Sequence, residues 1–179
     1  ANFTYSARVK RTGGYDAGLK LYPANYLALR MGSSVASTDS LWYPGYVFGY
    51  ADGSGYAIFR ANSNGTLTAI QPWTYSSAIK NYDWNVLKVI ASGSTFKFYI
   101  NNTLVRTVTD TYRTNGYVGL EMYKYTTGTQ FQVDWATLTL LSSSYQNNDT
   151  VSPAQEALNL AAMRTGSQAD PRGAHEALP

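Results

Sequence analysis

Cysteine is absent from this 179-residue sequence, histidine occurs once, and only 14% of the residues are charged. Without cysteine the chain has no disulfide, no thiol nucleophile and no thiolate zinc site. The single histidine, His175, excludes a multi-histidine metal centre. No apolar run approaches the roughly 18 to 20 residues that cross a bilayer, and no signal-peptide pattern is present. Redox chemistry, zinc hydrolysis and membrane insertion are therefore not expected.

The charge balance is mildly basic, with 14 Lys and Arg against 11 Asp and Glu. The basic residues occur one or two at a time along the chain, a distribution that predicts no nucleic-acid partner, because nucleic-acid sites cluster their cations. Aromatic residues make up 15% of the chain, and 16 of them are tyrosine. A chain rich in Tyr, Thr, Ser, Asn and Gly with few charges suits a secreted or cell-surface protein, and Ala1 fits a processed N-terminus.

Short alternating apolar runs, broken every 8 to 12 residues by Gly, Asn, Asp or Pro, cover residues 2–141. This rhythm predicts an all-β protein, and the number of strands favours two antiparallel sheets packed face to face as a β-sandwich. The segment 32–42 breaks the rhythm and is expected to be a long surface loop. The expected strands are 3–10, 17–21, 26–31, 46–50, 56–61, 66–70, 86–90, 95–100, 103–108, 116–122 and 130–141.

The composition changes after Leu141, so we expect one β-sandwich domain over residues 1–141 and a polar linker with a C-terminal tail over residues 142–179. Ser152 as N-cap and Pro153 at the first helical position predict a short helix over 154–164. The last residues are small and polar, and we expect them to be poorly ordered.

The later strands and turns carry a family resemblance. The sequence resembles the concanavalin A-like lectin/glucanase superfamily, and its closest branch is similar to the laminin G-like and 3-keto-disaccharide hydrolase-like jelly rolls. The resemblance covers about residues 2–140, and it implies a jelly roll that presents carbohydrate on its concave face or rim loops. It rests on Asp16 to Lys20, Asn25 to Arg30, Trp84 to Val89, Ala91 to Ser94, Phe98 to Asn101, Asp110, Gly116 to Leu120 and Phe131 to Asp134.

One departure from the family concerns the start of the sandwich. Members usually begin with a further strand before the position of Phe3, and this sequence lacks it. Because an open sheet edge invites pairing, we expect that edge to be covered by the chain's own tail or by another molecule. Self-association through the sheet edge or the C-terminal tail follows as an expected partner interaction.

Catalytic residues are not evident in the sequence. The glucanase branch uses Glu and Asp at alternate positions of one strand, a spacing that brings two carboxylates within reach of one glycosidic bond. No such motif exists here, and Glu121 and Asp134 each stand alone in their strands. We expect Glu121 to pair with a Lys or Arg on a solvated face, and Asp134 to accept main-chain or Tyr hydrogen bonds. No Ser-centred nucleophile elbow is present either.

Aromatic residues in or beside loops are the strongest functional signal. Sugars stack their C–H faces on Trp and Tyr rings, and their hydroxyls bond to amides, carboxylates or arginine. Strand faces also use tyrosine heavily, and Trp84 and Trp135 are expected in the core or at a sheet edge. The candidate glycan-binding residues are Trp42, Tyr43, Tyr46, Trp73, Tyr75 and Tyr82, with polar contacts from Arg30, Arg60 and Asn25.

Loop oxygens leave a calcium site open, since Ca2+ takes six to eight oxygen ligands from Asp, Asn and main-chain carbonyls. The candidate ligands are Asp16, Asp52 and Asp110. The turn 52–55 is equally an ordinary hairpin turn, and no EF-hand spacing occurs. No other cofactor is expected.

These observations lead to one expected function and two alternatives. The first is a non-catalytic carbohydrate-binding or adhesion module of a secreted or cell-surface protein, which binds a glycan or polysaccharide through loop aromatics. The second is a structural subunit of an extracellular assembly that exchanges strands or tails between chains. The third is a glycosidase-like enzyme with an atypical carboxylate pair.

Overall fold

The computed structural model describes residues 1–12, 24–32, 42–53, 55–122 and 130–142. The chain divides into two compact units, Ala1–Tyr145 and Gln146–Pro179, and the second lies outside the described residues. None of the described residues belongs to a helix long and apolar enough to span a membrane. The described strands are β1 (Phe3–Thr12), β2 (Asn25–Met31), β3 (Gly45–Ala51), β4 (Gly55–Ala61), β5 (Leu67–Thr74), β6 (Asn85–Ser92), β7 (Thr95–Ile100), β8 (Thr103–Thr109), β9 (Tyr117–Met122) and β10 (Gln130–Leu140).

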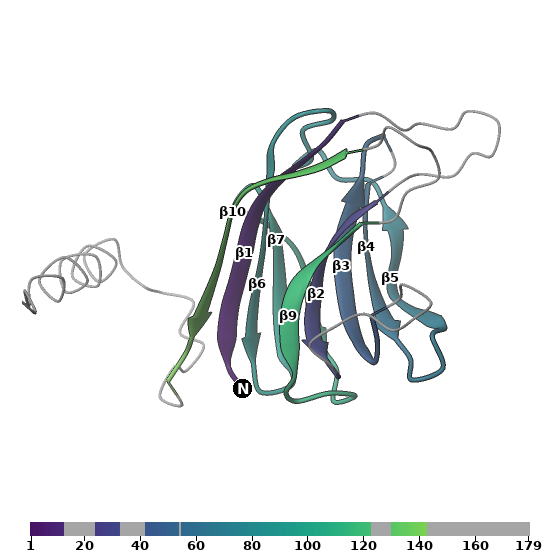
Figure 1. Cartoon of the computed structure of the whole chain (residues 1–179), viewed down its shortest axis with the longest axis vertical. Helices are drawn as coiled ribbons and strands as arrows, with labels where there is room; N and C mark the ends of the chain where they lie inside the picture. The colour runs from purple at the N-terminus through teal and green to yellow at the C-terminus, as the bar shows by residue number, and fades with distance from the viewer. Residues whose placement is uncertain (13–23, 33–41, 54, 123–129, 143–179) are drawn as a thin grey trace, which may run out of the picture. The chain divides into compact units, whose positions relative to one another are not determined.

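Two five-stranded antiparallel sheets form the first unit (Figure 1). The first sheet has the strand order β10-β1-β6-β7-β8, and the second has the order β5-β4-β3-β2-β9. Their inner faces meet through aromatic rings: the centroids of Phe48 and Phe98 are 5.0 Å apart, and those of Tyr46 and Phe96 are 4.9 Å apart. The predicted all-β sandwich of two antiparallel sheets is confirmed.

Strict alternation along the strands of the first sheet builds the core. In β1, β6 and β7 buried residues alternate with half-exposed ones, as a strand with one buried face requires. Each fully buried large side chain contributes roughly 1.5 to 3 kcal/mol relative to exposure. The core includes Phe3, Tyr5, Val9, Leu27, Leu29, Phe48, Ile58, Leu87, Val89, Phe96, Phe98 and Ile100.

The turn between β7 and β8 shows how local sequence sets the register. Asn101 and Asn102 both have positive φ, 48° and 67°, which Asn tolerates better than most residues and which tight hairpin turns require. The side chain of Asn101 is also engaged, since its Oδ1 accepts from the Val86 amide at 2.8 Å and its Nδ2 donates to the Ala78 carbonyl at 2.8 Å. The Asn101 side chain therefore links the β7–β8 turn to β6 and to the loop before β6.

Most expected strands appear within two residues of their predicted ends, although β5 continues to Thr74, four residues beyond its prediction. The expected strand 17–21, residues 33–41 of the expected loop and the expected helix 154–164 lie outside the described residues. The strand that begins at Phe3 is not an edge strand, because β1 pairs with β6 on one side and with β10 on the other. The last strand thus covers the flank that the sequence left open.

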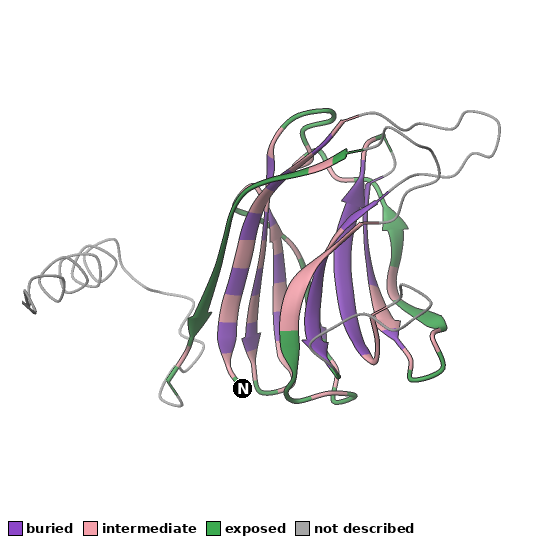
Figure 2. Cartoon of the chain, in the orientation of Figure 1, coloured by how far each residue is buried: buried purple, intermediate pink, exposed green. Residues whose placement is uncertain are grey.

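Burial along β10 is unlike burial along its neighbour (Figure 2). Leu138 and Leu140 lie opposite Tyr5 and Phe3 of β1 and therefore share the inward side of the pleat. Their β1 partners are 5% and 3% exposed, whereas Leu138 is 48% and Leu140 is 72% exposed. Apart from Phe131, which packs against it, the hydrophobic core consequently ends at β1, one strand before the edge of the first sheet.

Candidate functional site

The outer face of the second sheet carries an apolar cluster that is separate from the core. Ala28 and Val47 lie opposite each other on β2 and β3, and both are buried together with Met31. Three half-buried aromatic side chains pack against this cluster: Tyr26, Trp42 and Phe59. We call the surface formed by Tyr26, Trp42, Phe59, Trp73 and Glu121 the aromatic face.

Two glycines allow the rings to approach the sheet. A Cβ added at Gly119 of β9 would collide with the ring of Trp42, and one added at Gly49 of β3 would collide with the ring of Tyr26. Because neither position has a side chain, each ring occupies the space above the backbone of its glycine. The sequence thus provides two hollows on the outer face, and an aromatic ring occupies each.

Trp73 of β5 forms the exposed end of the aromatic face. Its ring meets the ring of Phe59 edge-on, with centroids 6.2 Å apart and planes at 65°. Edge-to-face pairs of this kind contribute about 0.5 to 1.5 kcal/mol beyond their buried area. Trp73 remains 39% exposed, so part of an oriented indole ring faces solvent.

Glu121 of β9 adds a carboxyl group to the aromatic face. It lies opposite Tyr26 on β2, and its Oε2 atom is buried without a hydrogen-bond partner. Burial raises the pKa of the Glu121 carboxyl, since the charged form loses water that no donor replaces. The expected pairing with Lys or Arg on a solvated face is therefore wrong.

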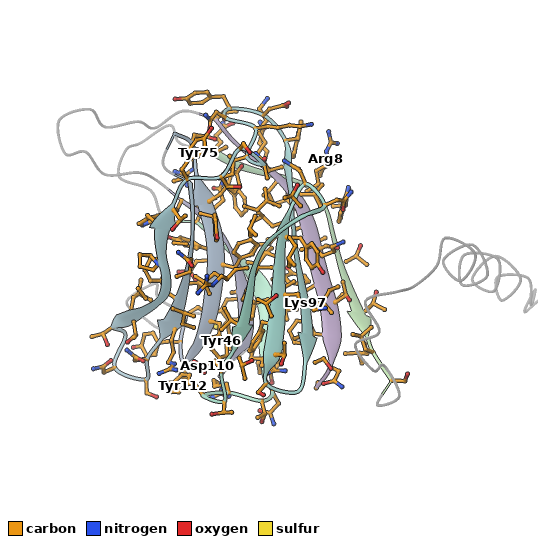
Figure 3. All side chains as sticks on the ribbon, turned by 180° about the vertical axis from the view of Figure 1, so that it is seen from behind. Arg8, Tyr46, Tyr75, Lys97, Asp110 and Tyr112 are labelled. Atoms are coloured by element: carbon orange, nitrogen blue, oxygen red, sulfur yellow. The ribbon has the colours of Figure 1, made fainter. Side chains whose placement is uncertain are left out.

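Asp110 joins two predicted glycan-binding residues at one end of the sandwich (Figure 3). The Tyr46 hydroxyl donates to Asp110 at 2.7 Å, Arg60 forms an ion pair with it, and the Tyr112 amide donates to it at 2.8 Å. Burial alone would raise the pKa of Asp110, but these donors lower it overall. Burial and the bond to Asp110 raise the pKa of Tyr46 to about 12. These polar atoms serve one another, which leaves them little capacity for a ligand or a Ca2+ ion.

Arg30 is a core residue, although the sequence predicted a glycan contact for it. It is 1% exposed, and its guanidinium donates to the carbonyl oxygens of Arg113 at 2.8 Å, Gly93 at 2.7 Å and Ala1 at 3.2 Å. The guanidinium carbon lies 4.6 Å from the centroid of the Phe96 ring, and burial lowers the pKa of Arg30. Arg30 therefore holds three distant segments together inside the protein.

Asn25 is likewise buried, at 1% exposure, and its Oδ1 accepts from Arg11 Nε at 3.2 Å. Tyr46 is also 1% exposed. Burial thus removes Arg30, Asn25 and Tyr46 from the surface on which a glycan would be bound.

Tyr75 and Tyr82 lie on the loop that follows β5 and are 79% and 70% exposed. Figure 3 places Tyr75 at the end of the sandwich opposite Tyr46 and Asp110. The Tyr82 amide donates to Asp52 Oδ1 at 3.1 Å, and burial, the largest influence, raises the pKa of Asp52. Tyr43, the remaining aromatic candidate, is half-buried.

The metal candidates do not come together in the part of the chain that the structure describes. No three residues of the types His, Cys, Asp or Glu are close enough there to hold one ion. Asp52 and Asp110 belong to separate loops with separate hydrogen-bond partners, and Asp16 lies outside the described residues.

The aromatic face was only partly visible in the sequence. Trp42 and Trp73 were predicted, whereas Tyr26, Phe59 and the position of Glu121 were missed. A signal was present, because β2 and β3 have apolar or small residues on both sides of the pleat, a pattern typical of strands covered on both faces.

Comparisons with known proteins find similar solved structures. No protein-family profile and no curated protein matches the chain. The carbohydrate binding module CBM66 from Bacillus subtilis is similar in structure, with a TM-score of 0.52 and 20% identity over 78% of this chain and 73% of that one. Sheep galectin-11 in complex with glycerol has a TM-score of 0.51 and 9% sequence identity, over 77% of this chain and 90% of that one. Caenorhabditis elegans galectin LEC-6 has a TM-score of 0.50 and 10% identity, over 77% of this chain and 82% of that one. The chain therefore shares the two-sheet jelly-roll fold of these proteins.

Proposed function

We propose that this chain is a non-catalytic carbohydrate-binding or adhesion module of a secreted or cell-surface protein, and that its glycan binds on the aromatic face. The main support is a part-exposed tryptophan, Trp73, on the same face of the second sheet as Glu121, whose Oε2 atom has no hydrogen-bond partner. The Bacillus neighbour, a carbohydrate binding module by name, and the two galectin folds support the same class of function.

The chemistry of the aromatic face suits a sugar. An indole ring offers an apolar surface to the C–H face of a pyranose or furanose ring. A carboxylate accepts hydrogen bonds from sugar hydroxyls, and those bonds would replace the water that Glu121 has lost. Trp73 on β5 and Glu121 on β9 lie at opposite edges of the second sheet, about 19 Å apart at a strand spacing of about 4.8 Å. A glycan of several sugars would be needed to stack on Trp73 and bond to Glu121 at once.

Tyr75 extends this surface at the end of β5. It follows Trp73 by two residues and is 79% exposed. A longer oligosaccharide would contact Tyr75 after Trp73, which agrees with the predicted role of both aromatics.

The test uses two tryptophans of equal exposure on opposite sheets. Trp73→Ala removes a ring that is 39% exposed on the aromatic face, and Trp135→Ala removes one that is 40% exposed on β10. Screening the full chain on a glycan array identifies a ligand, and calorimetry then measures its affinity. We expect about a tenfold loss for Trp73→Ala and little change for Trp135→Ala. Equal losses for the two variants, or no glycan bound by the wild type, would overturn the proposal.

The alternative function, an assembly subunit, is favoured by the exposed strand β10. Three residues of its inward row, Val133, Leu138 and Leu140, are exposed, although Phe131 of the same row packs against the core. Its outer edge pairs with no other described strand. The one charged residue of β10, Asp134, forms a salt bridge with Arg8 at 2.5 Å. Two β10 strands could therefore pair without bringing two unpaired negative charges together. A long edge strand without unpaired charges is a template for pairing with another strand. The partner would be a second copy of this chain, with the two β10 strands antiparallel.

Light scattering separates the two functions. Leu138→Lys puts a charge on β10, and the control Leu104→Lys puts the same charge on β8, at the opposite edge of the first sheet. The two leucines are similarly exposed, Leu138 at 48% and Leu104 at 49%. An assembly predicts a wild-type dimer or polymer that only Leu138→Lys dissociates, with glycan binding retained. A monomeric wild type excludes assembly through β10.

A further inference from the structure

Two asparagine residues of the chain are followed directly by glycine. They are Asn64, before Gly65 in the turn between β4 and β5, and Asn115, before Gly116 just ahead of β9. Both asparagines are exposed. In such a pair the main-chain nitrogen of the glycine can attack the side-chain amide, because glycine has no side chain to obstruct the approach. Sequence and exposure thus make the two pairs alike, and their hydrogen bonds distinguish them.

The first pair is held at both reacting groups. The Gly65 amide donates to the Asn62 carbonyl at 2.9 Å, so the hydrogen that this nitrogen must lose is already bonded. The Oδ1 atom of Asn64 accepts from the Thr66 amide at 3.2 Å and from the Thr66 hydroxyl at 2.7 Å. These bonds must break or bend before the Gly65 nitrogen reaches the side-chain carbon of Asn64. The turn therefore opposes the reaction.

The second pair has no comparable restraint. Within the residues that the structure describes, no hydrogen bond engages the side chain of Asn115. Gly116 precedes Tyr117, the first paired residue of β9, and outside the strand ladders of the described residues its amide donates no hydrogen bond. The Asn115 side chain can thus turn toward the Gly116 nitrogen without losing a bond.

We propose that Asn115 is a site of spontaneous deamidation, which converts it into aspartate and isoaspartate. The Gly116 nitrogen loses its proton to water and bonds to Cγ of Asn115, the Cγ–Nδ2 bond breaks, and ammonia leaves with a proton. Water then opens the resulting imide ring by breaking one of its bonds to the Gly116 nitrogen. Addition of water at Cγ gives aspartate, and addition at the main-chain carbonyl carbon gives isoaspartate. Water is the one co-reactant.

Arg113, two residues before Asn115, is fixed to buried residues. Its Nε donates to the Arg30 carbonyl at 2.9 Å, its carbonyl accepts from Arg30 at 2.8 Å, and its amide donates to the Tyr46 hydroxyl at 3.0 Å. Isoaspartate carries its side-chain methylene in the main chain, so the modified chain is one atom longer after Arg113. Because the anchored side cannot take up this atom, the change falls on the segment that follows.

The segment that follows enters β9 through a close contact at Gly116. A Cβ added at Gly116 would collide with the backbone of Arg30 and Met31, so the chain has little room to shift in that direction. We expect the inserted atom to displace the start of β9 relative to its partner β2. Because Glu121 lies on β9, the displacement would extend to the aromatic face.

Peptide mapping by mass spectrometry measures deamidation at the two sites separately. The full chain is stored at mildly alkaline pH, once folded and once in concentrated urea. In the folded protein we expect Asn115 to react about tenfold faster than Asn64, since hydrogen bonds of ordinary strength restrain only the latter. In urea these bonds are lost, and the two sites should react at similar rates. Each site is thus compared with itself and with the other.

Two variants separate the modification from its effect on the fold. Asn115→Gln removes the reacting side chain, and freshly prepared Asn115→Asp supplies the new charge without the extra main-chain atom. Hydrogen exchange of the β9 amides should be faster in stored than in fresh wild type. Stored Asn115→Gln and fresh Asn115→Asp should both exchange as the fresh wild type does.

Three results would overturn the proposal. Equal rates at the two sites of the folded protein would mean that the bonds in the turn have no effect. A faster reaction at Asn64 would mean that the Thr66 donors activate its amide. Reaction of Asn115 in urea alone would mean that the fold protects it. Unchanged β9 exchange after storage would overturn the expected displacement. None of these measurements involves glycan binding, so failure here is distinct from failure of the proposed function.

Discussion

The two outer faces of the sandwich follow the same pleat but present opposite chemistry. The aromatic face is apolar, has glycines beneath its rings and contains a carboxyl group with an unpartnered oxygen. The outer face of the first sheet carries half-exposed Arg8, Lys10, Lys88, Lys97 and Tyr99, which we call the basic face. There Arg8 pairs with Asp134 and lies over the Trp84 ring, and Lys88 lies over the Tyr99 ring. The rings of the first face cover the buried side chains of Ala28, Met31 and Val47, whereas the second face is a solvated surface. Substitutions should therefore change stability more at the first face than at the second.

The largest expected effect on this contrast comes from one methyl group on the aromatic face. Gly119→Ala places a Cβ where the Trp42 ring lies, and overpacking of this kind costs about 1 to 3 kcal/mol. Ser6→Ala on the outer side of β1 should change stability by less than about 0.5 kcal/mol. Urea unfolding of both variants measures the difference.

Removing the Trp42 ring tests the cause. In Gly119→Ala with Trp42→Ala the added methyl group has space, so the combined loss should be smaller than the sum of the single losses. Additive losses would show that the ring and the glycine do not interact.

A smaller effect is expected from Glu121→Gln. Because burial raises the pKa of Glu121, the folded state favours the neutral carboxyl, and wild-type stability should be highest below the unfolded pKa and fall as pH rises through the folded pKa. The amide carries no charge, so the variant should gain about 1 kcal/mol at pH 7 and lose this dependence. Thermal unfolding from pH 4 to pH 8 follows both changes.

Asp134→Asn is the matched control on the other side of the sandwich. Its carboxylate is 44% exposed and its partner Arg8 40% exposed, so its removal should change stability by less than about 1 kcal/mol. If Glu121→Gln changed stability as little as Asp134→Asn at every pH, the Glu121 carboxyl would be no more shielded from water than the Asp134 carboxyl.

The smallest effect concerns Lys88→Gln, which loses the contact with the Tyr99 ring. Exposed cation–π contacts contribute about 0.5 to 1 kcal/mol, so unfolding should shift by no more than that. Lys80→Gln, from the loop after β5, serves as the comparison. A loss well above 1 kcal/mol would show that the basic face is structural as well as charged.

The inward rows of the strands were predictable because alternation is a local property. Phe96, Phe98 and Ile100 point to the core as their spacing indicates. Arg30 was not predictable, because the pairing of β2 with β9 shifts between Ala28 and Met31 and Arg30 takes a positive φ of 51°. That irregularity depends on the partner strand and leaves no mark in the sequence of β2.

On both outer faces, the grouping of residues depends on strand pairing. Trp42 and Trp73 were visible as aromatics in or beside loops, but the hollows beneath the rings of Tyr26 and Trp42 depend on Gly49 and Gly119, which only strand pairing brings to β2. Arg8 and Lys88 are 80 residues apart in the sequence, and only the order β1-β6-β7 makes them neighbours. Patterns within a strand were visible, whereas patterns across strands were not.

The pairing of β1 with β10 also sets an order in time. The first and last strands of the sandwich are joined over ten paired positions, from Phe3 with Leu140 to Thr12 with Gln130. During synthesis β1 leaves the ribosome with no partner until β6 follows, and one of its sides stays open until nearly the whole domain has been made. Such non-local pairing slows folding. The first sheet is therefore complete only when β10 pairs with β1. A nascent chain arrested before residue 130 should exchange its β1 amide protons with solvent faster than the finished protein.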